Sequence, residues 1–308
     1  MTFDRGATLT TATTFGNSDN SNLGPTAGNG FYKRWPDDLA LLQDIGITDI
    51  RLTFDWARLQ PKPGAWSGDW SERFSQMLDA ADAIGLRVWA TGHEGDEPKW
   101  VTNEGGYGAD DVATKWWPRY LERLADTFGD RVHGWIPFAT VEPDTTAAAW
   151  SATWSTLGGG ALPVVASLDG AEPGRIDGFL GRTDRIGVVL AHGEVVSDSP
   201  GDERLELMRE RLHTTLQSCA ERAGDVPLLV SQFTPHHDDR DVAGQIVSVF
   251  VTAVDQAIAD GADIGVAFLD PAIAGPYSPN GLLGTDRDRE PAADAFLVEP
   301  AADGGGDG

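Results

Sequence analysis

Short strand-like runs of apolar residues recur along this chain, and helix-like stretches separate most of them. The stretches between the runs repeat apolar residues every three or four positions, as amphipathic helices do. The first helix is expected to begin at Asp37, whose side chain can cap a helix ahead of Leu39, Leu42 and Ile45. The runs predict eight strands, at 7–13, 48–54, 86–91, 132–139, 162–167, 186–191, 226–231 and 263–269.

Eight strands that alternate with helices in a chain of 308 residues predict an α/β fold, a single (β/α)8 TIM barrel. We expect residues 1–300 to form this barrel and residues 301–308 to be a disordered tail. The short interval between the fifth and sixth strands leaves room only for a stub helix near 175–180. A doubly wound open sheet is the alternative, but no G-x-G-x-x-G motif follows the first strand.

The charge of the chain argues against several classes of function. Its 48 Asp and Glu against 23 Lys and Arg give a formal net charge of −25 at pH 7, which repels nucleic acid. No run reaches the ~18 to 20 apolar residues of a membrane span, and no signal peptide is recognisable, so we expect no membrane partner. One cysteine, Cys219, provides neither a disulfide framework nor a multi-cysteine zinc site. The chain is expected to be cytoplasmic.

The acidic residues are mostly short, with 34 Asp against 14 Glu, and the basic residues are 19 Arg and four Lys. This composition is typical of halophilic proteins, because a screening length of about 3 Å at 1 M salt removes the repulsion between such charges. A GC-rich genome that favours codons for Asp, Arg, Ala and Gly is the alternative explanation. The halophilic explanation concerns the habitat of the protein and leaves its chemistry open.

Polar residues follow most of the predicted strands, where a barrel enzyme carries its catalytic groups. Carboxylates with aromatic neighbours suit a sugar, because a carboxyl group can protonate a leaving oxygen and Trp rings stack on pyranose rings. No metal or other cofactor is expected, since the adjacent His236 and His237 lack a ligand spacing such as H-E-x-x-H. The candidates are His93, Glu94, Glu142, Asp169, His192, Glu194, Gln232 and Asp270.

Longer motifs surround some of these candidates. Tyr32–Gly64 reads YKRWPDDLALLQDIGITDIRLTFDWARLQPKPG, GHEGDEP contains His93 and Pro98, and FGDRVHGWIPFATVEP ends just after Glu142. Together with VDQAIADGADIGVAF near the eighth strand, these segments resemble glycoside hydrolase family 1, the β-glucosidases and their relatives. The resemblance covers about residues 30–145 well and 225–270 loosely. The matching residues of the first segment are Trp35, Asp38, Gly46, Arg51, Trp56, Arg58, Pro61 and Gly64.

The resemblance implies roles for three residues. Glu142 falls on the general acid/base, and we expect it to be buried near Trp135 and Val141, which would raise its pKa. Arg51 falls on the arginine that hydrogen-bonds the nucleophile carboxylate, and His93 falls on the imidazole that contacts a sugar hydroxyl. The alternatives are a turn carboxylate for Glu142, a structural ion pair for Arg51 and a core histidine for His93.

The chain departs from the family at the nucleophile. The family has Glu in T-E-N-G after the seventh strand, whereas this chain has Gln232 in VSQFTP. A neutral amide cannot attack an anomeric carbon as a carboxylate does. Glu94 also replaces the Trp of the third-strand motif. Replacing Gln232 by Glu is therefore expected to create or increase hydrolysis of activated β-glycosides, with Arg51 keeping the new carboxylate ionised.

Three functions remain open at this stage. The chain is a β-glycosidase that pairs Glu142 with a carboxylate foreign to the family, a degenerate barrel that only binds a carbohydrate, or a barrel for an unrelated reaction. In each of the first two the partner is a carbohydrate ligand, bound by Arg51, His93, Glu94 and Asp270. The candidates for the second catalytic carboxylate are Asp169, Glu194, Glu94 and Asp270.

Overall fold

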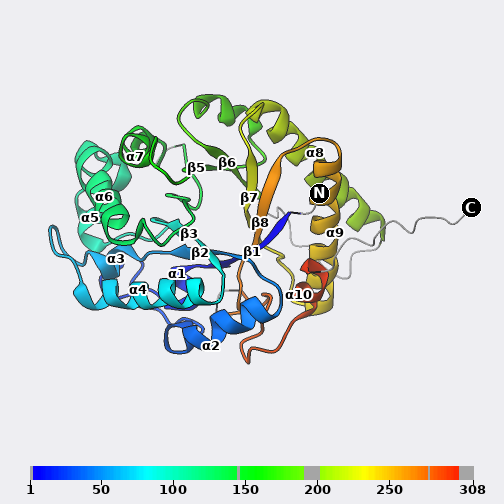
Figure 1. Ribbon diagram of the computed structural model, residues 1–308, viewed down its shortest axis with the longest axis horizontal. Helices are drawn as coiled ribbons and strands as arrows, with labels where there is room; N and C mark the ends of the chain where they lie inside the picture. Colours follow the sequence, from blue (N-terminus) through cyan, green and yellow to red (C-terminus); the bar gives the residue numbers. More distant parts are fainter. Residues whose placement is uncertain (1–2, 144–145, 191–201, 277, 298–308) are drawn as a thin grey trace, which may run out of the picture.

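The eight predicted strands are present and form one parallel sheet around the centre of the molecule (Figure 1). The structure is a computed structural model that describes residues 3–143, 146–190, 202–276 and 278–297. The strands follow the order β4-β3-β2-β1-β8-β7-β6-β5, so the first and last strands of the chain are neighbours. The strands are β1 (Asp4–Leu9), β2 (Asp49–Thr53), β3 (Arg87–Thr91), β4 (Gly134–Trp135), β5 (Val165–Asp169), β6 (Arg185–Leu190), β7 (Leu228–Phe233) and β8 (Ile264–Leu269).

The sheet closes into a barrel because its two end strands, β4 and β5, also meet. Trp135 of β4 pairs with Val164, and its backbone N–H donates to the carbonyl of Pro163 at 2.8 Å. Beyond β4, the N–H of Val141 donates to the carbonyl of Ser167 at 2.7 Å. These contacts confirm the (β/α)8 barrel and rule out the doubly wound open sheet.

β1 and β4 differ most from their predicted bounds, and β5 and β7 lie slightly further along the chain than predicted. Local hydrogen bonding explains where β1 and β4 end. β1 ends at Leu9 because the next residue, Thr10, accepts a hydrogen bond from the N–H of Thr13 and starts a helical turn. β4 is only two residues long because Pro137 has no N–H to donate to a neighbouring strand. The carbonyl of Pro137 still accepts hydrogen bonds from Gly92 and His93, which fixes the end of β3.

Helices surround the strands and form the outer wall of the barrel (Figure 1). Side-chain caps start two of the longest ones: Ser67 accepts from Trp70 at α4, and Asp239 accepts from Asp241 at α9. The α-helices are α1 (Thr11–Thr14), α2 (Phe31–Asp44), α3 (Trp56–Leu59), α4 (Gly68–Ala83), α5 (Lys99–Asn103), α6 (Trp117–Phe128), α7 (Trp150–Leu157), α8 (Asp202–Ala223), α9 (Arg240–Ala259) and α10 (Pro291–Phe296). The tighter or wider turns are η1 (Gly106–Gly108), η2 (Val112–Trp116), η3 (Thr146–Ala149) and η4 (Pro173–Gly178).

Helix α2 begins earlier than the sequence predicts, so Asp37 is not its N-cap. The side-chain oxygen of Asn29 accepts from the N–H of Phe31 at 3.0 Å and starts the helix there. The neighbouring Asp38 is fully buried and accepts hydrogen bonds from Arg287 at 2.9 and 2.8 Å. This buried pair ties α2 to the segment that follows β8.

The short interval between β5 and β6 carries only the 3-10 turn η4, close to the stub helix expected at 175–180. Helix α8, which follows β6, packs against both η4 and β6. Helix α8 therefore covers the outside of the barrel at the β5–β6 connection, which has only the short turn η4.

Large aromatic rings that face glycines fill part of the barrel interior. A Cβ on Gly6 of β1 would lie 2.5 Å from the ring of Phe268, and one on Gly134 of β4 would lie 2.6 Å from the ring of Trp89. Only glycine permits this close approach. The rings belong to an apolar cluster inside the barrel, so the barrel has a packed core and not a pore.

Helix α9 meets the length and composition of a membrane span, which is an exception to the expectation that the chain contains no such run. However, 56% of its most apolar stretch is buried inside the structure. The helix packs against α8 and α10, and its Phe250 stacks on Phe233 of β7 with ring centroids 4.1 Å apart. These contacts are those of a core helix in the barrel wall.

Candidate active site

Arg51 of β2 is the centre of a polar network at the barrel mouth, by which we mean the carboxyl ends of the strands. Its side chain is fully buried and reaches across the barrel to β7. Its Nη1 donates to the carbonyl of Ser231 at 2.8 Å and to the side-chain oxygen of Gln232 at 3.3 Å. Its Nη2 forms an ion pair with Glu94, which follows β3. The expectation that Arg51 reaches Gln232 is confirmed.

Glu94 is held by two donors from β2. Arg51 contacts its Oε1, and the hydroxyl of Thr53 donates to its Oε2 at 2.5 Å. The side chain of Glu94 is 16% exposed to solvent, whereas that of Arg51 is fully buried. Glu94 therefore forms the accessible side of the ion pair.

Gln232 connects this ion pair to a second carboxyl group, that of Asp270. The amide nitrogen of Gln232 donates to Oδ2 of Asp270 at 3.1 Å, while its amide oxygen faces Arg51. The hydroxyl of Thr234 donates to the same Oδ2 at 3.2 Å. The Arg51 network thus runs from Glu94 through Arg51 and Gln232 to Asp270, and it contains two carboxyl groups for one cation.

The environment of Asp270 favours its protonated form. Burial, followed by the negative charge of Glu94, raises the pKa of the Asp270 carboxyl to about 7, although the charge of Arg51 limits the rise. At neutral pH Asp270 therefore exchanges a proton readily, whereas Glu94 stays paired with Arg51. A buried carboxyl group whose pKa lies near neutral pH is typical of acid/base sites.

The raised pKa of Asp270 predicts a pH-dependent stability. Its folded-state pKa of about 7 lies above the ~3.9 of an unfolded Asp, so the folded state binds the proton more tightly and loses stability as the pH rises from about 4 to 7. In Asp270→Asn this loss is absent. Between pH 5 and pH 8 we expect the unfolding free energy of the variant to gain about 2 to 3 kcal/mol relative to wild type, measured by urea denaturation.

The control for this measurement is Asp238→Asn, which alters an exposed side chain on the loop after β7. Its difference from wild type should be the same at both pH values. If the unfolding free energy of Asp270→Asn relative to wild type is the same at both pH values, Asp270 does not bind the proton that we assign to it.

His93 lies in an aromatic wall next to the mouth. Its ring meets those of Tyr107, Trp117 and Phe138 edge-on, with centroids 4.8 to 6.5 Å apart. Burial lowers the pKa of His93 to about 4, and a hydrogen bond with the backbone of Asp96 opposes the shift. The imidazole is therefore neutral at physiological pH and can donate or accept a hydrogen bond there.

Several buried polar atoms around the mouth have no hydrogen-bond partner among the described residues. A buried polar atom without a partner costs about 1 to 3 kcal/mol, so such atoms mark places where water or a ligand hydroxyl can bind. The strand register aligns Thr8 with Arg51, and Thr91 with Thr53. The atoms are Thr8 Oγ1, Arg51 Nε, Thr91 Oγ1, His93 Nδ1 and Asp270 Oδ1. They suit a molecule that is rich in hydroxyl groups.

The structure does not bury Glu142 as the sequence predicts. Its side chain is exposed, although Trp135 and Val141 are buried. The N–H of Glu142 donates to the hydroxyl of Thr146 at 2.7 Å, and Arg175 contacts the carbonyl of Val141. The backbone at Glu142 is thus fixed, but the loop after β4 carries its side chain into solvent. The expectation of a carboxyl buried between apolar walls is wrong.

Asp169, another predicted carboxylate, lies apart from the Arg51 network. It ends β5, and its Oδ1 accepts from the N–H of Ala171 at 2.9 Å within its own loop. Burial and the nearby charge of Asp169 raise the pKa of the Cys219 thiol in α8 to about 11, so this cysteine is an inert thiol. His192 and Glu194 fall on residues 191–201, outside the described residues.

Sequence reasoning missed the hydroxyl residues of the network. Thr53 is the last residue of β2 and Thr234 directly follows β7, which is the same signal that selected the charged candidates. Ser231 was also missed, and it contributes a backbone carbonyl to Arg51. Its hydroxyl shares a hydrogen bond of 2.6 Å with Ser167, which ties β7 to β5 beneath the mouth.

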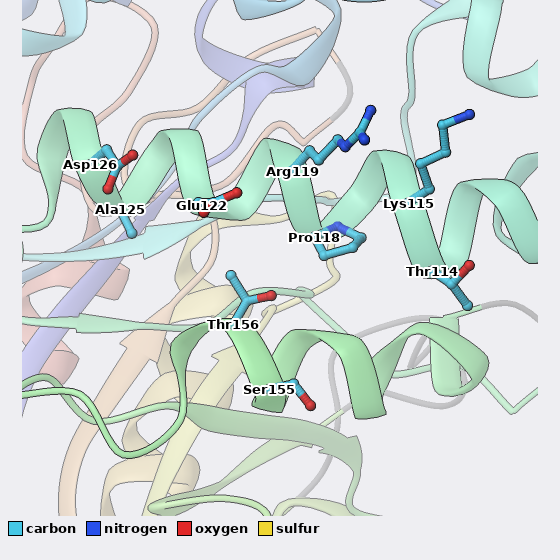
Figure 2. A pocket seen from close by; sticks show the side chains of 9 residues that line it. All are labelled: Thr114, Lys115, Pro118, Arg119, Glu122, Ala125, Asp126, Ser155 and Thr156. Carbon is cyan, nitrogen blue, oxygen red and sulfur yellow. The ribbon is translucent and has the colours of Figure 1, made fainter.

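Figure 2 shows the side chains that line a hollow between α6 and α7, and none of them belongs to the Arg51 network. It has a volume of about 570 Å³, and exposed side chains of both charge signs line it, among them Arg119 and Glu122. No group of three or more His, Cys, Asp and Glu in the described part of the chain is placed to hold a metal ion. The Arg51 network is therefore the candidate active site.

Comparison with known proteins relates this barrel to a family. The model of glycosyl hydrolase family 1 matches residues 8–155. β-Glucosidase A of Thermotoga maritima is 27% identical over 122 residues, which are 39% of this chain and 27% of that protein. A bifunctional β-D-glucosidase/β-D-fucosidase of Bifidobacterium breve is 30% identical over 123 residues, 38% of this chain and 26% of that protein. The match thus spans about a quarter of the length of these curated relatives.

Solved structures match nearly the whole chain. The apo structure of a β-glucosidase called 1317 has a TM-score of 0.78 at 17% identity and covers 96% of this chain and 97% of its own. The family 1 β-glucosidase of Thermotoga maritima has a TM-score of 0.71 at 14% identity and covers 96% of each chain. At these identities the likeness shows the fold. Over residues 8–155 this chain is similar in sequence to glycosyl hydrolase family 1, and its barrel is similar in fold to the solved family 1 β-glucosidase.

Proposed function

We propose that this chain binds and hydrolyses a β-linked glycoside at the barrel mouth, with Glu142 as the general acid/base. The observation that carries the proposal is the Arg51 network, in which one buried guanidinium contacts both Gln232 and Glu94 at the strand ends. The named relatives are β-glucosidases, which supports a β-linked sugar as the substrate. In this proposal Gln232 takes the position of the family nucleophile and does not itself attack the sugar.

The polar atoms of the mouth would bind the sugar ring next to the bond that is cleaved. Each ring hydroxyl is both a donor and an acceptor, and His93 Nδ1 and Asp270 Oδ1 are buried atoms without a protein partner among the described residues. A typical hydrogen bond contributes about 0.5 to 1.5 kcal/mol, so a few such contacts add affinity. The neutral imidazole of His93 adds specificity without adding charge.

Glu142 would act on the leaving group from the solvent side of the mouth. Its exposed side chain is accessible to a glycoside that enters from solvent, and a bound sugar would cover it. A carboxyl group in this place can protonate a leaving oxygen as a general acid.

A carbohydrate-binding barrel without catalysis is the second candidate. Two observations favour it: the residue beside Arg51 on β7 is the neutral amide of Gln232, and Glu142 is exposed instead of held in an apolar pocket. In this alternative the ion pair of Arg51 with Glu94 shapes a binding site only.

Replacing Glu142 by Gln tests the proposal. A general acid contributes about 10²- to 10⁴-fold, so we expect kcat/KM for 4-nitrophenyl β-glucoside to fall by at least a hundredfold. The loss should be much smaller for 2,4-dinitrophenyl β-glucoside, because its leaving group needs little protonation. Initial rates from absorbance measure both, and Glu104→Gln, an exposed carboxylate at the end of α5, is the control.

Equal losses with both leaving groups would contradict the acid role of Glu142. If the wild-type protein cleaves neither glucoside but glucose or cellobiose raises its Tm by mass action, the binding-only barrel is the correct reading.

A further inference from the structure

We propose that Glu94 is the nucleophile of this barrel, so that the attacking carboxylate stands on the loop after β3 instead of on β7. The inference rests on the proposed function and specifies which residue carries its covalent step.

The charge balance assigns the negative charge of the mouth to Glu94. Arg51 is fully buried and contacts one carboxylate, that of Glu94, whereas its contact on β7 is the neutral amide of Gln232. Among the described residues, the hydrogen bonds that link Arg51 to the second carboxyl group, Asp270, run through that amide. A buried cation needs one anion in contact, and Glu94 supplies it from the opposite side of the mouth to β7.

Glu94 is also the accessible member of the network. Its side chain is 16% exposed, and the cation beneath it is completely covered. Both of its oxygens accept a hydrogen bond, from Arg51 and from Thr53, so the carboxylate is held in one orientation. Attack on an anomeric carbon requires such an oriented, charged and reachable oxygen.

The loop that carries Glu94 is fixed at the residue before it, His93. The N–H of His93 donates to the carbonyl of Pro137 at 3.0 Å, and the carbonyl of His93 accepts from Ala139 at 2.9 Å. Gly95 follows Glu94 with a φ of +78°, a conformation that glycine adopts without strain. The chain therefore turns directly after Glu94 while the residue before it stays bonded to the segment that follows β4.

Hydrolysis of the glycoside then takes two steps. In the first, an oxygen of Glu94 bonds to the anomeric carbon, the bond from that carbon to the leaving oxygen breaks, and Glu142 gives its proton to the leaving oxygen. In the second, a water oxygen bonds to the anomeric carbon, the ester bond to Glu94 breaks, and the water proton returns to Glu142. One glycoside and one water are consumed, and one sugar and one alcohol are released.

Covalent trapping in the wild-type protein tests this step without any substitution. Incubation with 2,4-dinitrophenyl 2-deoxy-2-fluoro-β-glucoside should add one fluoroglucosyl group to the chain. After digestion, mass spectrometry should find the group on Glu94. An adduct on any other residue would overturn the proposal while leaving hydrolysis itself intact.

Two variants give an independent readout. In Glu94→Ala, we expect hydrolysis of 2,4-dinitrophenyl β-glucoside to fall at least a thousandfold, and added azide to restore turnover by entering the space of the lost carboxylate. The product of rescue should be the α-glucosyl azide, because azide attacks the face opposite the leaving group. Glu97→Gln, three residues along the same loop and bonded to Thr102, is the matched control and should keep wild-type activity.

The outcomes separate this inference from the proposed function. If the wild type hydrolyses the glucoside and Glu94→Ala keeps a tenth of that rate or more, the proposed function stands and the nucleophile is another residue. If Glu94→Ala is inactive and folded by its thermal melt, but azide gives no glucosyl azide, Glu94 only positions Arg51 and the inference is wrong. A wild type that hydrolyses no glucoside overturns the proposed function and this inference with it.

Discussion

Replacing Arg51 by Met is expected to lower the free energy of unfolding by about 3 to 5 kcal/mol at pH 7, the largest stability effect in the mouth. The guanidinium is fully buried and contacts Glu94, Gln232 and the backbone of β7. Its removal leaves Glu94 without its cation in a partly buried place. Urea denaturation at neutral pH measures the loss.

A surface ion pair provides the matched control. Arg222 and Asp177 are 2.7 Å apart and both are more than half exposed, so Arg222→Met should cost at most about 1 kcal/mol. The double variant Arg51→Met with Glu94→Gln should recover part of the loss, because no unpaired charge remains. An Arg51→Met variant within about 1 kcal/mol of wild type would mean that Glu94 finds another partner and that the network is not electrostatically coupled.

The fold could be predicted from the sequence because its signals are local. Each strand is a short apolar run, and parallel strands separated by helices have few arrangements open to them. The errors lie where one residue changes the local hydrogen bonding. Thr10 ends β1 by accepting from Thr13, and Pro137 shortens β4 because it has no N–H.

The candidate site could be predicted only in part. The positions of Arg51 and Gln232 follow from the motifs and from the strand order, and their contact is confirmed. The ion pair of Arg51 with Glu94 depends on how two side chains meet across the mouth, which no single segment encodes. The exposure of Glu142 depends on the path of the loop after β4, and this path is likewise set by contacts with other segments, such as that of Arg175 with Val141.

The contacts of Gln232 change the hydrolysis rate that we expect for the variant Gln232→Glu. From the sequence, a carboxylate beside Arg51 should create or raise hydrolysis. In the structure Arg51 already has Glu94, and the amide nitrogen of Gln232 donates to Asp270 at 3.1 Å. The substitution replaces that donor with an acceptor, so two carboxyl groups in contact must share a proton. We expect the single variant to hydrolyse 2,4-dinitrophenyl β-glucoside no faster than wild type.

The double variant Gln232→Glu with Glu94→Gln is expected to behave differently, because it moves one carboxylate from the loop after β3 to β7 and keeps the charge of the network unchanged. Arg51 can then pair with the new carboxylate at the end of β7, where its Nη1 already lies 3.3 Å from the side-chain oxygen of residue 232. We expect its rate on 2,4-dinitrophenyl β-glucoside to exceed that of Glu94→Gln alone at least tenfold, and the trapped fluoroglucosyl group to move to position 232. A large gain in the single variant, with no further gain in the double one, would show that Glu94 does not compete for Arg51. If the prediction holds, the residue that attacks is the carboxylate that Arg51 keeps charged, whether it stands after β3 or on β7.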